Sequence, residues 1–388
     1  MTPSAPAHSP TRRSRESASH PNARKDPTAP AAPDSPLNSA DLRARVEHVL
    51  SDFLARQRPV LDAISPDLGP LADALADFLL DRGKRLRPAF CYWGWRGAGG
   101  ADSEEIVAAA AALELLHACA LIHDDVMDGS DTRRGQPAVH RRFASLHRGS
   151  GWAGDPAAFG SSAAILLGNL CLIWADNLLV SAGLPAESLA AATPVFDQMR
   201  VELMAGQYLD LLEQALGGGS VERALRVARY KSAKYTVEGP LHLGGTLAGA
   251  TRQTLATYTG YGIPLGEAFQ LRDDILGVFG DPQVTGKPAG DDLREGKRTV
   301  LVAAALDRAN PRQAALVRRH LGDPHLDDVG VAALREVMVD TGGLRYVESL
   351  IEEFAGQSLA AIGDRAPVEP SAREVLRTLA VAATTRHE

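Results

Sequence analysis

The stretch that decides the fold is residues 105–128, EIVAAAAALELLHACALIHDDVMD. Between Glu105 and the acids at its end, this stretch is apolar apart from Glu114 and two histidines. A helix formed here would have no polar face and should be buried on all sides. It nevertheless ends in three carboxylates, Asp124, Asp125 and Asp128. Acidic groups at the carboxyl end of a helix oppose its dipole, so a merely solvated helix end explains them poorly. We therefore expect a buried helix whose acidic end faces a cation.

The spacing of these acids indicates which cation they would bind. Asp124 and Asp128 are four residues apart and share one face of a helix, with Asp125 about 100° away. Mg²⁺ suits such a set because it takes oxygen ligands, keeps several waters and commonly shares the phosphate oxygens of a substrate. Arg133 and Arg134 follow closely, and arginine binds phosphate groups well. The stretch predicts a Mg²⁺–diphosphate site at the mouth of an apolar helical cavity.

Composition narrows the class of protein. The 388-residue chain is 45% hydrophobic with a formal net charge of −7, an acidic balance that argues against nucleic-acid binding. Cys91, Cys119 and Cys171 have no metal-ligand spacing and are typical of core residues in a reducing compartment. No uninterrupted apolar run reaches about 18 residues, and polar residues follow Arg12-Arg13, so we predict a cytoplasmic protein without a membrane span.

The rest of the chain is patterned as helices. Residues 1–38 are rich in Pro, Ser, Ala and Arg, and we predict a disordered tail there. From Ser39 on, apolar residues recur at helical spacing, and no series of strand-like runs with period two is present. We predict one all-α domain, 39–388, a helical bundle around a central apolar cavity. The expected helices beyond the first are 71–82, 86–96, 103–128, 161–182, 186–216, 220–238, 240–249, 252–279, 298–309, 312–320, 330–340, 344–363 and 370–384.

A second acidic pair lies within another long apolar helix. Asp273 and Asp274 follow Gln270 by about one turn. Taken alone, the pair could simply form a salt bridge with Arg272. Facing the first cluster across a bundle, it would complete a site for two or three metal ions.

Basic residues gather in three further segments, 81–88, 230–235 and 285–299. Each could be an ordinary charged surface. In an acidic protein with two aspartate clusters, they fit anionic groups better. A cationic set without neighbouring acids would bind one diphosphate directly, and the acid-rich set would bind another through Mg²⁺. Two diphosphates held differently imply a reaction between two substrates.

Taken together and in this order, the motifs resemble those of the trans-isoprenyl diphosphate synthases, the polyprenyl synthetase family. The matching segments span about residues 80–300. They are Gly83-Lys84-Arg85-Leu86-Arg87-Pro88, His117, Asp124-Asp125-Val126-Met127-Asp128, Arg133-Arg134-Gly135, Gly206-Gln207-Tyr208-Leu209-Asp210, Lys231-Ser232, Phe269-Gln270-Leu271-Arg272-Asp273-Asp274, Thr285-Gly286-Lys287 and Gly296-Lys297-Arg298-Thr299.

The resemblance implies a role for each of these residues. Asp124, Asp128 and Asp273 would ligate Mg²⁺, two or three ions in all, with Asp125 and Asp274 as further ligands or as partners of bound water. The catalytic set would be these five aspartates with Lys231. The residues implied to hold the allylic diphosphate are Arg133, Lys231, Ser232, Gln270, Lys287 and Lys297, and those implied to hold isopentenyl diphosphate without metal are Lys84, Arg87, His117 and Arg134.

The implied activity is that of a prenyltransferase. Metal-assisted ionisation of dimethylallyl, geranyl or farnesyl diphosphate would give an allylic carbocation, which the double bond of isopentenyl diphosphate attacks before a proton is lost. Such chemistry needs strong positive charge at the leaving group and a dry apolar sleeve. Family members are usually homodimers, and the resemblance implies the same here.

The chain departs from the family pattern in a few places. Gly277 stands where many members have a third aspartate in the second motif. Either two carboxylates suffice, which we favour, or Asp281 supplies another. Ser232 replaces the usual threonine and keeps its hydroxyl. The segment 147–160 is longer than average and is interpreted as a surface insertion.

The helix before Asp124 also bears on product length. One helical turn is about 5.4 Å, close to one extended isoprene unit. Ala120 and Cys119, just before the acids, are small, and Leu116 and Leu113 lie one and two turns further down. Family experience links aromatic residues here to short products, so their absence points beyond C15, and the leucines predict a stop near C20. We expect geranylgeranyl diphosphate, with farnesyl and longer products left open.

Other functions remain open from the residues alone. A class I terpene cyclase would use the same ionisation but would not need a metal-free basic set at Lys84, Arg87 and Arg134. A non-catalytic subunit of a synthase heteromer would have lost aspartates, and both clusters are kept here. His123-Asp124 could belong to a phosphohydrolase, but the further histidines of such a site have no clear candidates.

Overall fold

The computed structural model describes residues 41–80, 83–280 and 290–384. The predicted tail 1–38 lies outside these residues, as do Asp281 and Lys287. All described residues belong to one compact unit.

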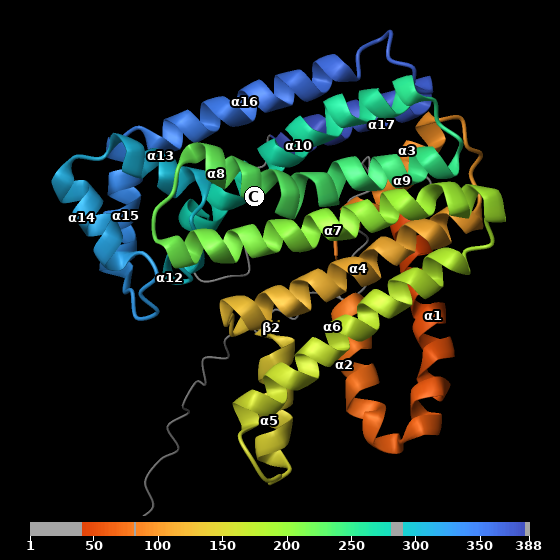
Figure 1. Ribbon diagram of the computed structural model, residues 1–388, viewed down its shortest axis with the longest axis horizontal. Helices are drawn as coiled ribbons and strands as arrows, with labels where there is room; N and C mark the ends of the chain where they lie inside the picture. The colour runs from red at the N-terminus through yellow and green to blue at the C-terminus, as the bar shows by residue number, and fades with distance from the viewer. Residues whose placement is uncertain (1–40, 81–82, 281–289, 385–388) are drawn as a thin grey trace, which may run out of the picture. The chain divides into compact units, whose positions relative to one another are not determined.

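Within the described ranges nearly every element is a helix, which confirms the predicted all-α class (Figure 1). The one pair of strands there is a short hairpin. The elements are α1 (Leu42–Ile64), η2 (Pro66–Leu68), α2 (Gly69–Leu80), α3 (Leu86–Gly97), α4 (Glu104–Asp128), β1 (Thr132–Arg133), β2 (Gln136–Pro137), α5 (Val139–Gly149), α6 (Pro156–Val180), α7 (Ala186–Leu216), α8 (Val221–Val227), η3 (Ala228–Glu238), α9 (Gly239–Leu247), α10 (Arg252–Phe279), α12 (Asp291–Arg294), α13 (Val300–Arg308), α14 (Pro311–His320), α15 (Asp328–Asp340), α16 (Gly343–Ala361) and α17 (Pro370–Thr384).

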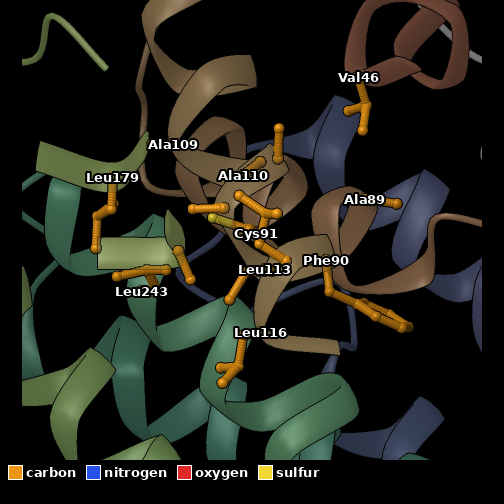
Figure 2. Close-up of a cluster of buried hydrophobic side chains, with 14 of the residues drawn as sticks. Val46, Ala89, Phe90, Cys91, Ala109, Ala110, Leu113, Leu116, Leu179 and Leu243 are labelled. Atoms are coloured by element: carbon orange, nitrogen blue, oxygen red, sulfur yellow. The ribbon is translucent and has the colours of Figure 1, made fainter. Parts of the chain in front are cut away.

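Helix α4 is the buried centre of the larger hydrophobic cluster. It packs against α1, α2, α3, α5, α6 and α9, as its apolar surface requires. Figure 2 shows Leu113 and Leu116 of α4 among buried side chains that include Cys91 of α3, Leu179 of α6 and Leu243 of α9. The helix ends at Gly129, whose φ of 68° suits a residue without a Cβ. The acids therefore emerge from the core at a defined point.

A second hydrophobic cluster lies around the carboxyl half of α10. It joins Leu271 and Ile275 to residues of α13, α15 and α16. Figure 1 shows α16 running along α10, and the two helices pack against each other. The first acidic motif thus ends a helix of the larger cluster, whereas the second lies in the half of α10 that packs in the smaller cluster.

Two helices, α4 and α6, are long and apolar enough to cross a membrane by length and composition alone. From the sequence we expected no segment of this kind. That expectation considered only uninterrupted apolar runs, and both helices contain polar residues within their apolar windows. In α4, 72% of the apolar window is buried inside the protein, as in the core helix of a folded domain; in α6 the share is 44%. Length and composition are therefore weak evidence for a span.

The region between α4 and α7 differs most from the predicted helices. Helix α5 was not predicted, and α6 begins at Pro156 rather than near residue 161. The start of α6 has a recognisable signal, because the Asp155 side chain accepts hydrogen bonds from the Ala157 and Ala158 amides and proline follows it. The predicted insertion 147–160 thus includes the ends of two helices and the short link between them.

The predicted helix 220–238 is also not uniform. After α8, the segment η3 is a π-helix, with hydrogen bonds that span five residues instead of four. Nothing in the local sequence predicts this change. Its consequence is functional, because η3 carries Lys231 and Ser232.

Candidate active site

A pocket of about 870 Å³ collects most of the predicted site residues. Its lining comes from α3, α4, the β1–β2 hairpin, α7, α8, η3, α10, α12, the first residue of α13 and the segments before α3 and α13. The predicted residues that line it are Lys84, Arg87, His117, Ala120, Asp124, Arg133, Arg134, Lys231, Ser232, Gln270, Asp273, Asp274 and Lys297. Asp125, Asp128, Leu113, Leu116 and Cys119 do not line it.

Asp124 is held by two polar groups from other helices. Lys231 Nζ lies 3.0 Å from Asp124 Oδ1, and Gln207 Nε2 donates to the same oxygen at 2.9 Å. Lys231 also bonds Asp210 at 2.7 Å. Burial favours the neutral acid, but Lys231 and Lys297 outweigh it and lower the pKa of Asp124. Asp124 is therefore an anion.

The close approach of α7 to η3 makes this contact possible. A Cβ at Gly206 of α7 would lie 2.4 Å from the backbone nitrogen of Lys231, closer than any real side chain could come. Only glycine lets the two segments pack at this distance. Gly206 in this way helps to bring Lys231 to Asp124.

Asp125 does not line the pocket itself but contacts Arg133, which does. It is fully buried and accepts hydrogen bonds from Arg133 Nε at 2.8 and 2.9 Å. The hairpin that carries Arg133 turns through Arg134 and Gly135, whose φ values of 53° and 76° match the two-residue turn preferred between antiparallel strands. In this structure Asp125 orients an arginine of the pocket.

Asp128 and Lys297 lie in a buried charged cluster. Lys297 Nζ is 3.5 Å from Asp128, 3.4 Å from Asp292 and 2.7 Å from Glu295. Burial and the nearby Asp124 raise the pKa of Asp128 to about 6, and within the described ranges its buried Oδ1 has no hydrogen-bond partner. The lysine does not fully compensate these acids.

Negative charge is also crowded at the second acidic pair, Asp273 and Asp274. Gln270 Nε2 donates to Asp274 at 2.7 Å. Burial raises the pKa of Asp274 to about 8, and Asp292 and Asp273 add to the effect. Asp273 lines the pocket beside it.

The structure suggests why Gly277 can replace the third aspartate. A Cβ at Gly277 would lie only 1.9 Å from Oδ2 of Asp292. The carboxylate of Asp292, from α12, therefore occupies the space next to this turn of α10. Asp292 lines the pocket, whereas Asp281, the alternative considered from the sequence, is not among the described residues. Sequence reasoning missed Asp292 because its proximity depends on how α12 folds back.

Arg298 belongs to the matching motif Gly296-Lys297-Arg298-Thr299, but the motif gave it no role in the site. It lines the pocket, and its buried Nε and Nη1 have no hydrogen-bond partner among the described residues. Burial lowers its pKa, and no carboxylate in the described part of the chain counters this effect as several do for Lys297. An uncompensated guanidinium of this kind fits an anionic ligand.

The donor set fits a hard divalent cation that a ligand helps to hold. The described pocket lining has seven acidic residues, of which Asp124, Asp273, Asp274 and Asp292 belong to or lie beside the two acidic motifs, and oxygen donors are what Mg²⁺ prefers. Among the described residues, no three acidic, histidine or cysteine side chains are already close enough to enclose an ion. Water or substrate oxygens would have to complete the coordination.

Comparison with known proteins assigns the family. Residues 70–338 match the family model of polyprenyl synthetases. The chain belongs to the polyprenyl synthetase family. It is an enzyme of the trans-prenyltransferase class, in agreement with the resemblance of its motifs.

This synthase has relatives with several product lengths. It is 30% identical over 338 residues to the geranylfarnesyl diphosphate synthase of Aeropyrum pernix, covering 86% of this chain and 96% of that protein. It is 31% identical over 294 residues to the geranylgeranyl diphosphate synthase of Sulfolobus acidocaldarius, covering 75% and 83%. The relatives therefore do not assign one chain length.

The fold of the synthase matches solved structures. The geranylgeranyl pyrophosphate synthase of Corynebacterium glutamicum, solved with isoprenyl diphosphate and magnesium, is 41% identical with a TM-score of 0.86, covering 89% of this chain and 99% of that chain. The polyprenyl synthase of Caulobacter crescentus, solved with calcium and isoprenyl diphosphate, is 29% identical with a TM-score of 0.70, covering 89% and 98%.

The basic side of the synthase pocket depends on a buried ion pair. Arg85 has a left-handed backbone, with φ of 51°, and its Nη1 donates to Glu114 of α4 at 2.6 Å. Its Nη2 donates to the Leu79 carbonyl at 2.6 Å. Both charged side chains are almost fully buried, at 4% and 6% exposure. This anchor leaves Lys84 and Arg87, on either side of Arg85, lining the pocket.

Glu114→Gln should destabilise the synthase, because it removes the buried counter-ion of Arg85 and leaves, as an acidic partner among the described residues, only the partly exposed Glu47, whose Oε1 lies 3.8 Å from Arg85 Nε. We expect a loss of about 3 kcal/mol in the free energy of unfolding, measured by urea denaturation at neutral pH. Glu222→Gln, which breaks the exposed Arg226–Glu222 pair, is the matched control and should change almost nothing. Equal losses in the two variants would contradict the role of Glu114 as an anchor.

Proposed function

We propose that the protein condenses isopentenyl diphosphate with dimethylallyl, geranyl and farnesyl diphosphates, and that its main product is geranylgeranyl diphosphate. One observation carries the proposal: a single pocket holds a carboxylate cluster together with a second, basic set that includes Lys84, Arg87 and Arg134. The first set suits a diphosphate held through metal, and the second suits one held directly. The Corynebacterium relative was solved with isoprenyl diphosphate and magnesium, which supports a site for both kinds of ligand.

The carboxylates bind two or three Mg²⁺ ions in this proposal. Asp124, Asp128 and Asp273 are the ligands expected from the motifs, with Asp274 and Asp292 beside them. Bound Mg²⁺ supplies the Lewis acidity that weakens the bond between the allylic carbon and its diphosphate. The raised pKa values of Asp128 and Asp274 support a cation here, since a bound cation would relieve the crowding of negative charge.

The side chains of the pocket perform the remaining tasks. The allylic diphosphate is held by Arg133, Lys231, Ser232, Gln270, Lys297 and Arg298, with Lys287 as a further ligand from outside the described residues. Their positive charge stabilises the departing diphosphate. Lys231, now paired with Asp124 and Asp210, changes partner when substrate enters. Ala120, Leu121 and Leu203 give the pocket an apolar wall that keeps water from the cation.

The decisive assay supplies Mg²⁺, isopentenyl diphosphate and an allylic starter of five, ten or fifteen carbons. We expect consumption of isopentenyl diphosphate and release of longer prenyl diphosphates, with loss of activity on chelation of the metal. Formation of a hydrocarbon from farnesyl or geranylgeranyl diphosphate, with isopentenyl diphosphate untouched, would instead support a terpene cyclase.

Ala120→Phe should shorten the product. Ala120 lines the pocket, whereas Cys119, Leu116 and Leu113 are buried beyond it, and Figure 2 shows the two leucines within the core. A phenyl ring at residue 120 would fill the path along α4 that the growing chain is expected to take. Product length is read by chromatography of the dephosphorylated alcohols. Ala157→Phe, at an exposed position, is the control, and an unchanged product from Ala120→Phe would contradict the proposed direction of the cavity.

We also propose that the synthase is a homodimer in the cytoplasm. Large apolar side chains are exposed on α6 and α7, two helices joined by the Arg200–Asp176 hydrogen bond at 2.8 Å. Such a patch is unusual on a monomer and is typical of an interface. Its members are Ile165, Leu166, Ile173 and Val180 of α6 with Val201, Met204 and Tyr208 of α7. The three free, buried cysteines support a reducing compartment.

Leu166→Glu should separate the dimer, because a carboxylate buried in an apolar interface has no counter-ion. Leu166 is 65% exposed in the single chain, so the substitution should not disturb folding. Sedimentation velocity measures the outcome, and Val329→Glu, at an exposed position of α15, is the control. A wild-type monomer, or an unaffected dimer in Leu166→Glu, would contradict the assigned interface.

A further inference from the structure

Tyr235 joins two residues of the basic set. Its hydroxyl oxygen lies 3.1 Å from Nδ1 of His117, and the guanidinium carbon of Arg87 lies 4.3 Å from the centre of its ring. Arg87 Nη2 also donates to Thr236 Oγ1 at 2.8 Å. Tyr235 is only 3% exposed, yet it forms part of the pocket wall. No motif used above includes it as a site residue.

We propose that Tyr235 is a positioning residue for the diphosphate that binds without metal. Its hydroxyl sets the tautomer and orientation of His117, and its ring supports the guanidinium of Arg87. This inference rests on the proposed function, because it deepens the assignment of Lys84, Arg87, His117 and Arg134 to isopentenyl diphosphate.

The hydrogen bonds of His117 determine which of its two ring nitrogens carries the proton. A buried tyrosine hydroxyl needs an acceptor for its proton, and Nδ1 of His117 is the partner within reach. If the hydroxyl donates to Nδ1, the neutral ring carries its proton on Nε2. Burial and the surrounding arginines lower the pKa of His117 well below its usual value, so the ring is neutral. Nε2–H is then the donor available to a phosphate oxygen.

The ring of Tyr235 acts on Arg87 in a different way. A guanidinium at this distance over an aromatic face is attracted by the ring quadrupole, and the planar group is held parallel or tilted to that face. Together with Thr236, the ring restricts Arg87 before substrate arrives. Less side-chain freedom is then lost on binding.

The π-helix η3 places these groups where they act. Lys231, Ser232, Tyr235 and Thr236 all line the pocket. A π-helix has more residues per turn than an α-helix, so pairs of residues four and five apart lie close to one face. One segment therefore contributes both to the acid-rich side, through Lys231, and to the metal-free basic side, through Tyr235.

The test is Tyr235→Phe, which removes the hydroxyl and keeps the ring. We expect KM for isopentenyl diphosphate to rise about tenfold, while KM for the allylic substrate and kcat change less than about twofold. Direct titration of isopentenyl diphosphate into metal-free protein should show the same weakening. Tyr235→Leu, which also removes the ring beneath Arg87, should weaken it further.

Tyr258→Phe is the matched control. Tyr258 is fully buried, and its hydroxyl donates to the Gly94 carbonyl at 2.8 Å, outside the pocket lining. It loses a comparable buried hydrogen bond, so its kinetics should equal those of the wild type while its unfolding temperature falls. If Tyr235→Phe behaves like this control, or weakens both substrates equally, Tyr235 is merely structural and the inference is overturned.

Two further outcomes keep the inference separate from the proposed function. If Tyr235→Phe does not fold, Thr236→Val removes the other support of Arg87 and should raise KM for isopentenyl diphosphate alone; an unchanged KM would overturn the inference. If the wild-type protein does not consume isopentenyl diphosphate, the proposed function fails and the inference fails with it. Wild-type turnover with an unaffected Tyr235→Phe variant overturns the inference only.

Discussion

The buried negative charge at the end of α4 is the constraint on which the site depends. An acid in the core must be neutralised, since an unpaired buried charge costs several kcal/mol. Each aspartate meets a cation from a different part of the chain: Asp125 meets Arg133 of the hairpin, Asp124 meets Lys231 of η3, and Asp128 meets Lys297 before α13. Folding the chain around α4 therefore also builds the pocket.

The nearby cations do not fully neutralise the carboxylates at the place where the reaction is expected. Asp128 and Asp274 keep raised pKa values of about 6 and 8, because burial and neighbouring carboxylates outweigh the nearby cations. On the basic side cations predominate: Lys84, Arg87 and Arg134 line the pocket, and Glu114 beside them pairs with the buried Arg85. One cavity thus has two kinds of diphosphate site. The acidic side suits a diphosphate held through metal ions, and the basic side suits one held directly.

Features that depend on nearby residues were predictable. The burial of α4 followed from an apolar surface on all sides, and α7 was predicted at its observed bounds, Ala186–Leu216. Features that depend on distant packing were not. The proximity of Asp292 to Gly277 arises because α12 folds back onto α10, and the π-helical form of η3 has no local signal. The sequence assigned Tyr235 no role, because its partners His117 and Arg87 come from two other helices.

The sequence by itself determined the helical class, the buried helix with its acidic end, and the family to which the ordered motifs belong. These follow from the period of apolar residues and from charges a few positions apart, both of which are local properties. Only the tertiary structure decided which cation meets which carboxylate, which residue stands beside Gly277, and how Tyr235 links His117 to Arg87. Such pairings join residues far apart along the chain, and helix packing sets their distances to within the few ångströms over which a hydrogen bond or ion pair acts.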